Sequence, residues 1–289
     1  MIPSAFEYHR PANLAEATQL LASSEDAKIL SGGHSLLPMM KLRLATPSVV
    51  IDIGRLDELR GIQEAGGALI IGANVTHYEA ETSAVLQQQC PILSETAAAI
   101  GDVQVRNAGT VGGSVAHADP SADWPAAMLA VNAEITLSKA GGTRTVSATD
   151  FFVDLLMTAM EEDEILTSIR VNANPPRTGG AYLKVPQPAS GFALAGVAAQ
   201  VTLGGDNTIQ QVAVGITGVD NKAFRASATE AALQGQAATE AAISQAAAQA
   251  TDGADALEDI HASAEYRLHL ARVYTKRALL QAVERAQNA

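Results

Sequence analysis

In the segment Lys28-Ile-Leu-Ser-Gly-Gly-His-Ser-Leu-Leu-Pro38, a short apolar run and one serine precede two adjacent glycines. Glycine pairs allow positive φ and let the backbone approach a ligand without a Cβ clash. Successive free N–H groups in such a turn form an anion-binding nest. The apolar residues that follow suit the start of a helix, which would add partial positive charge. The segment therefore predicts an anion site at the end of a strand.

A second segment, Gly109-Thr-Val-Gly-Gly-Ser114, repeats this pattern. Two such nests in one chain suit a ligand with two linked phosphates. A Gly-Gly pair alone is more often a plain turn. Four other pairs are interpreted as turns, at positions 66–67, 141–142, 179–180 and 204–205.

Composition narrows the class of protein. The 289 residues are 47% hydrophobic and 17% charged, so the chain can bury a core. A formal net charge of -12 argues against nucleic acid as a partner, because that partner needs a basic face. The single cysteine, Cys90, excludes a disulfide framework and a cysteine-ligated iron–sulfur cluster within this chain. We expect Cys90 to be a small buried apolar residue.

The ends and apolar runs of the chain predict a cytoplasmic protein. Residues 1–10 lack a basic segment followed by an apolar one, so we expect no signal peptide. No run of about 18 or more apolar residues occurs, so we expect no transmembrane segment.

The first 55 residues predict a small α/β subdomain. Strands at 5–10, 27–30 and 49–53 alternate with helices at 14–21 and 36–44, in β-α-β-α-β order. Asn13 is a suitable N-cap, with Glu16 placed for a capping box. No Gly-x-Gly-x-x-Gly follows a strand, so a Rossmann fold is not predicted.

Residues 56–175 predict a second subdomain. Hairpins are expected at 61–71 and 133–147, helices at 76–88, 92–100 and 124–131, an irregular polar segment at 114–123, a helix or turn at 150–157, and a strand at 164–171.

The Asn-, Pro- and Gly-rich segment 172–180 predicts a domain boundary. Beyond it, segments 181–185, 192–203 and 208–217 predict an antiparallel sheet, and 228–233, 240–250 and 265–286 predict helices. The predicted fold class is α+β, with domains at 1–175 and 176–289.

The sequence gives little indication of any other catalytic or metal site. Neither Gly-x-Ser-x-Gly nor a P-loop occurs, and no histidines have metal-binding spacing. Asp119 and Asp123 are either paired carboxylates or a capped loop, and both interpretations stay open. Lys184, taken alone, suits the edge of a sheet.

The two glycine segments and their surroundings resemble a known family. Ser31-Gly-Gly-His-Ser35 and Thr110-Val-Gly-Gly113 are similar to the two flavin pyrophosphate motifs of the FAD-binding medium subunit of molybdenum hydroxylases. That family includes carbon monoxide dehydrogenase and relatives of xanthine dehydrogenase. The resemblance extends to Phe6–Pro11, Gln104–Arg106 and Ala181–Lys184, and it covers nearly the whole chain.

The resemblance implies an N-terminal FAD-binding domain of two α/β subdomains (PCMH-like), about 1–55 and 56–175, and a smaller C-terminal domain. The implied site has two glycine segments and several separate positions that match cofactor-lining residues of relatives. Phe192 stands where the carbon monoxide enzymes of the family carry a tyrosine, so a hydroxyl is lost there. The implied cofactor-binding residues are Ile29, Leu30, Ser31, Gly32, Gly33, His34, Ser35, Leu36, Ile100, Gly109, Thr110, Val111, Gly112, Gly113, Ser114, Asp123, Leu166, Lys184 and Phe192.

The resemblance also implies an electron-transfer role with no catalytic residue of its own. FAD in this chain would take electrons from [2Fe-2S] clusters on a small partner subunit and pass them to an external acceptor. The substrate would react at a molybdenum cofactor on a large partner subunit, in a dimer of heterotrimers. The single cysteine agrees with clusters on a partner.

Two alternatives remain. A free-standing flavin oxidase of the vanillyl-alcohol-oxidase type also uses Gly-Gly-His motifs, but it needs a large substrate-capping domain, for which the segment after Gly180 is short. The second alternative is a non-catalytic scaffold subunit that has lost its flavin. The substrate stays open among carbon monoxide, N-heterocycles, purines and aldehydes.

Overall fold

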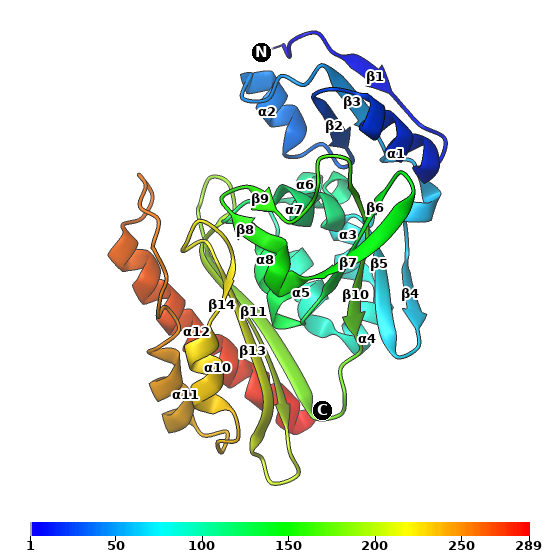
Figure 1. Ribbon diagram of the computed structural model, residues 1–289. Coiled ribbons are helices and arrows are strands. Elements are labelled where there is room, and N and C mark those ends of the chain that lie inside the picture. The colour runs from blue at the N-terminus through cyan, green and yellow to red at the C-terminus, as the bar shows by residue number, and fades with distance from the viewer. Residues whose placement is uncertain (1) are drawn as a thin grey trace.

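The computed structural model describes residues 2–289, which form three units (Figure 1). The N-terminal unit (blue) lies at the top of the view, above a helix-rich unit in cyan and green. The C-terminal unit (yellow to red) is a long sheet with helices beside it. Within residues 2–289, no helix is long and apolar enough to cross a membrane.

The first unit is a parallel three-stranded sheet with two crossover helices. Its elements are β1 (Glu7–His9), α1 (Leu14–Ser23), β2 (Ala27–Leu30), α2 (Leu36–Leu42) and β3 (Val49–Asp52). The strand order is β1-β3-β2, and parallel neighbours need such crossover connections. Asn13 caps α1 by accepting the N–H of Glu16 at 2.9 Å, as predicted. The Glu16 carboxylate binds the N–H of Ala12 instead of completing the capping box.

The second unit is a five-stranded antiparallel sheet covered by short helices. Its elements are η1 (Asp57–Leu59), β4 (Ile62–Ala65), β5 (Ala68–Gly72), α3 (His77–Thr82), α4 (Ala84–Gln89), α5 (Pro91–Ala98), α6 (Val103–Ala108), α7 (Val111–His117), α8 (Asp123–Ala130), β6 (Glu134–Lys139), β7 (Gly142–Ser147), α9 (Ala148–Phe151), β8 (Phe152–Asp154), β9 (Met157–Thr158) and β10 (Ile165–Asn172). The strand order is β4-β5-β10-β6-β7. The chain leaves the sheet after β5, forms α3 to α8, and returns at β6. Trp124 and Phe151 are fully buried in its core.

Three segments of this unit differ from the prediction. The helix expected at 76–88 is two helices, because Ser83 has an extended backbone and its hydroxyl caps α4. The segment expected to be irregular from 114 onward begins inside α7. Residues 150–157 form the end of α9 and most of the small β8–β9 hairpin.

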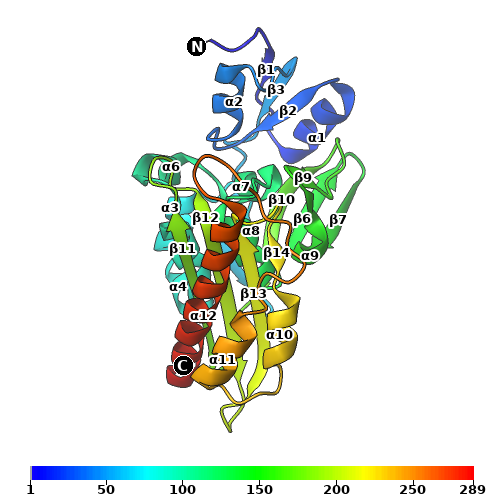
Figure 2. The same ribbon diagram turned by 90° about the vertical axis from the view of Figure 1, so that its left-hand side faces the viewer.

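The C-terminal unit is an antiparallel sheet between two helical layers. Its elements are β11 (Thr178–Pro186), β12 (Ala193–Leu203), β13 (Ile209–Thr217), β14 (Phe224–Arg225), α10 (Ser227–Leu233), α11 (Glu240–Ala247) and α12 (Ala264–Asn288). The strands are in sequential order, and α12 runs along the sheet with α10 and α11 beside it (Figure 2). The other face packs on α8 of the second unit. This arrangement confirms the predicted α+β class with an antiparallel C-terminal sheet.

Gly179 and Gly180 were expected in a turn, and this was wrong. Both lie within β11. A Cβ at Gly179 would collide with the backbone of Ala282 and Ala286 in α12. The glycine therefore permits close approach of helix and sheet rather than a reversal of the chain.

Candidate functional site

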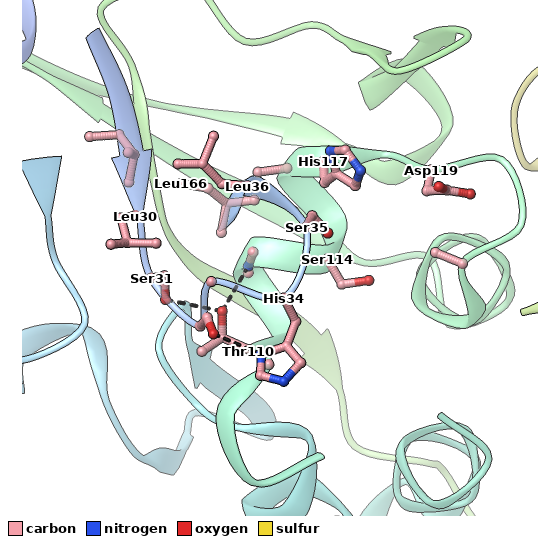
Figure 3. Close-up of a pocket in the computed structure, with 18 of the residues that line it drawn as sticks. Leu30, Ser31, His34, Ser35, Leu36, Thr110, Ser114, His117, Asp119 and Leu166 are labelled. Carbon is pink, nitrogen blue, oxygen red and sulfur yellow. Dashed lines mark hydrogen bonds between the residues drawn. The ribbon is translucent and has the colours of Figure 1, made fainter. Parts of the chain in front are cut away.

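A cavity of about 530 Å³ opens where the three units meet. The loop after β2 supplies one wall, α7 supplies the floor and the start of β10 supplies another wall (Figure 3). The C-terminal unit contributes Ser190, Gly191 and Phe192. This volume lies in the range of sites that enclose a small-molecule ligand.

The first glycine segment forms a backbone cradle in this cavity. Gly33 has φ of 74°, a conformation that favours glycine, and a Cβ there would come within 2.9 Å of the Leu37 side chain. The N–H groups of Gly32, Gly33, His34 and Ser35 donate to no acceptor within residues 2–289. Unpaired backbone donors of this kind suit an anion, as the sequence predicted.

The two glycine segments contact each other directly. Gly32 packs on the backbone of Ala108 and Gly109, and a Cβ at Gly32 would come within 2.7 Å of the Gly109 Cα. The Ser31 hydroxyl donates to Asn74 Oδ1 at 2.7 Å and lies 3.1 Å from Thr110 Oγ1. Asn74 is buried, so these bonds fix the position of the Ser31 loop against the second unit.

The second glycine segment is the first turn of a helix, not a second nest of free N–H groups. Its donors are already used. The N–H of Val111 donates to Val75 O at 2.9 Å, and that of Gly112 donates to Ala73 O at 3.0 Å. The N–H of Gly113 donates to the capping hydroxyl of Thr110 at 3.1 Å. The glycines of this segment therefore permit close packing against His77, Ala73 and Thr110, while the first segment offers the free N–H groups.

Polar side chains of α7 and the loop after it face the cavity. Figure 3 shows Ser114, His117 and Asp119 along one side, opposite Leu36 and Leu166. The Ser114 hydroxyl has no hydrogen-bond partner within residues 2–289. The Asp119 carboxylate accepts a hydrogen bond from the N–H of Ser121 at 2.8 Å and so caps its own loop. Asp119 and Asp123 share no hydrogen-bond partner among residues 2–289, so they are not paired carboxylates.

Asp123 is buried and paired with residues of the C-terminal unit. Lys184 Nζ lies 2.8 Å from its Oδ1 and 3.0 Å from its Oδ2, and the Tyr182 hydroxyl donates to Oδ1. Burial raises the pKa of Asp123 above its usual value, although Lys184 and Tyr182 oppose that shift. Burial, with Asp123 nearby, also holds the pKa of Tyr182 well above its usual value.

Lys184 also donates to the Gly191 carbonyl at 2.7 Å. The same ammonium therefore joins Asp123 to the loop that carries Phe192, a residue that is 44% exposed and lines the cavity.

The structure brings nearly all the predicted site residues to this cavity. Ile29 to Leu36, Gly109, Thr110 and Gly112 to Ser114 line it, as do Ile100, Asp123, Leu166 and Phe192. Val111 and Lys184 do not line it: Val111 is buried in the core, and Lys184 lies behind Asp123. Both residues instead pack behind the residues that form the cavity wall.

His77 is a cavity residue that the sequence patterns did not predict. It lines the cavity, is only 4% exposed, and its Nδ1 accepts a hydrogen bond from Trp124 Nε1 at 3.0 Å. Burial lowers the pKa of His77 to about 4, and the nearby His34 and Arg106 side chains add to that shift. The sequence around it shows only a helix cap at Thr76, so nothing local pointed to the cavity.

Comparisons with known proteins agree with this geometry. Residues 4–173 match the family described as FAD binding domain in molybdopterin dehydrogenase, and residues 180–282 match the CO dehydrogenase flavoprotein C-terminal domain. The chain is 42% identical to the carbon monoxide dehydrogenase medium chain of Hydrogenophaga pseudoflava, covering 96% of this chain and 97% of that one. It is 36% identical to the nicotine 6-hydroxylase medium subunit of Paenarthrobacter nicotinovorans, covering 96% and 97%.

A solved structure of carbon monoxide dehydrogenase from Hydrogenophaga pseudoflava matches with a TM-score of 0.96, at 44% identity and 99% coverage of both chains. The chain therefore belongs to the family of FAD-binding medium subunits of molybdenum hydroxylases. The resemblance inferred from the glycine segments is confirmed, and so are FAD as the cofactor and the class of oxidoreductase flavoprotein subunit.

Proposed function

We propose that this chain is the FAD-carrying electron-transfer subunit of a molybdenum hydroxylase complex. The observation that carries the proposal is the cradle of free N–H groups from Gly32 to Ser35, at the edge of a cavity of about 530 Å³. The fit to FAD is good, because a diphosphate needs such donors and the apolar walls at Leu36 and Leu166 suit a ring system.

The residues divide into three roles in this proposal. Gly32 to Ser35 would hold the diphosphate through the backbone, and Ser114 would add one hydroxyl donor. Gly112 would let α7 pack closely on Ala73 at the floor of the cavity, and Gly113 would leave room for the Thr110 cap. Asp123 would accept a hydrogen bond from the cofactor, while Lys184 holds that carboxylate and the Phe192 loop in position.

Bound FAD supplies the redox chemistry, which the protein side chains lack. The chain itself orients the cofactor and shields it from water. Cys90 is the single cysteine, is buried, and has its pKa raised by burial to about 12. It is no thiolate ligand, which supports our proposal that the [2Fe-2S] clusters lie on a small partner subunit. The molybdenum cofactor would lie on a large partner subunit. A dimer of such heterotrimers in the cytoplasm is the assembly we propose.

The partner would dock at the mouth of the cavity. The β8–β9 hairpin exposes Val153, Leu155, Leu156 and Met157, each between 46% and 56% exposed. Leu156 also lines the cavity, so this apolar surface is continuous with the cofactor site. Exposed apolar patches of this kind commonly mark protein interfaces, and a partner seated here would lie beside the flavin.

Residues 1–175 and 176–289 are the two domains in this proposal. Residues 195–286 hold one cluster of buried apolar residues, and residues 1–175 hold a second cluster and most of a third, which Tyr182, Ala198 and Ala223 join from the other part. The helix α8 and the strand β13 pack together between the two parts. Limited proteolysis that cuts first within 172–178 would support this division, and cutting elsewhere would contradict it.

The experiment that tests the function compares the isolated chain with the reconstituted complex. Both are loaded with FAD, and flavin absorbance is followed anaerobically with carbon monoxide, an N-heterocycle, a purine or an aldehyde. We expect reduction by one substrate in the complex and by none in the isolated chain. Reduction of the isolated chain by an organic substrate would instead favour the oxidase alternative, and a chain that binds no FAD would favour the scaffold.

A further inference from the structure

His77 lies where the two glycine segments meet. The backbone at 75–77 pairs with that at 109–111: His77 N–H donates to Gly109 O, and Val111 N–H donates to Val75 O, both at 2.9 Å. The imidazole then lies against Gly109, and a Cβ at Gly109 would come within 2.7 Å of His77 Nε2. Gly109 is therefore the residue that makes room for this ring.

The proton of the imidazole has a fixed position. Trp124 Nε1 is only a donor, so His77 Nδ1 must accept from it and carries no proton. In the neutral ring the proton is then on Nε2. Burial keeps the pKa of His77 near 4, so the ring is neutral at physiological pH. Nε2–H has no acceptor within residues 2–289, although the side chain is 96% shielded from solvent and lines the cavity.

We infer that His77 is a cofactor-binding residue that donates its Nε2–H to an oxygen of the FAD diphosphate. The residue adjoins Gly109 and Thr110, and Gly109 is in contact with Gly32 at the start of the free N–H groups. The inference rests on the proposed function, since it assigns one more donor to the same site.

A neutral donor is suited to this position for a physical reason. A protonated imidazole would be disfavoured chiefly by burial and further by the nearby His34 and Arg106 side chains. A neutral Nε2–H instead contributes a directed, charge-assisted hydrogen bond to a phosphate without burying another cation. Trp124 is then a positioning residue, because its indole N–H selects the tautomer.

Two variants of similar size separate this role from a structural one. His77→Asn keeps an acceptor near the Nδ1 position for Trp124 but has no donor that reaches the Nε2 position. His77→Gln extends an amide donor to about that position. FAD and ADP binding to the full-length apo chain are measured for both variants by titration, together with urea unfolding of the apo forms.

We expect His77→Asn to weaken FAD and ADP binding by roughly 10-fold or more, while His77→Gln restores most of the affinity. In wild-type protein with ¹⁵N-labelled histidine, the His77 signal should show the Nε2–H tautomer and shift when FAD binds. Wild-type affinity for FAD in a folded His77→Asn variant would overturn the inference while leaving the proposed function intact. Weakened FAD binding with unchanged ADP binding would overturn the assignment to the diphosphate. Absence of FAD binding by the wild-type chain would reject the proposed function itself.

Discussion

The buried ion pair between Asp123 and Lys184 gives the sharpest test of how the C-terminal unit supports the site. The perturbation is Lys184→Met. The side chains of Lys184 and Asp123 are 9% and 5% exposed, and Lys184 contacts both carboxylate oxygens. Removing one partner of a buried pair leaves an uncompensated charge, which costs about 3–5 kcal/mol. We expect a loss of that size in the free energy of unfolding at pH 8.

The pH dependence of this loss has a definite sign. Burial already raises the pKa of Asp123, and Lys184 is the strongest group that opposes the rise. In Lys184→Met the pKa of the folded state should rise further above that of the unfolded chain. Such an acid destabilises the fold progressively as the pH increases from the unfolded value through the folded value. The variant should therefore be closest to wild type in acid and furthest from it at pH 8.

The assay is urea unfolding of the apo chain followed by circular dichroism at pH 5 and pH 8. The matched control is the double variant Asp123→Asn with Lys184→Met, which removes both charges and keeps an acceptor for Tyr182. Its stability should lie closer to wild type than that of the single variant and should not depend on pH in this way. A single variant that loses less than about 1 kcal/mol at pH 8 would refute the reasoning, as would a double variant that is equally destabilised.

Three further predictions follow from individual residues. Gly33→Val should lower FAD affinity by roughly 10-fold or more, because its φ is 74° and its Cβ would meet Leu37; Gly66→Val, at φ of 59° in an exposed turn, should not. Normal flavin content in Gly33→Val would show that the cradle is an ordinary turn. Cys90 should not react with a thiol reagent at pH 8 until urea unfolds the chain, since burial raises its pKa to about 12; labelling of the folded protein would contradict that burial. Arg144→Gln should shift acid unfolding to higher pH, because Arg144 lowers the pKa of Glu164 and that stabilisation is lost as pH falls through the folded value; an unchanged acid midpoint would show that the pair contributes nothing.

The sequence alone determined the local features that depend on a few neighbouring residues. Asn13 as a helix cap, the Gly66-Gly67 hairpin and the strand that leads into Gly32 each follow from backbone preferences that act within a few positions. The order of two glycine segments was specific enough to identify the family, because few folds need that pattern twice.

Only the tertiary structure decided what each feature does. Gly112-Gly113 is a pair of adjacent glycines like Gly32-Gly33. Its two N–H groups, however, donate to Ala73 O and to the capping hydroxyl of Thr110, which no local sequence pattern encodes. Gly179 leaves room for the helix α12, which lies about a hundred residues further along the chain. Lys184 and His77 gain their roles from Asp123 and Trp124, which lie far from them in sequence. Burial and long-range hydrogen bonding set these roles, and both arise only when the distant segments pack together.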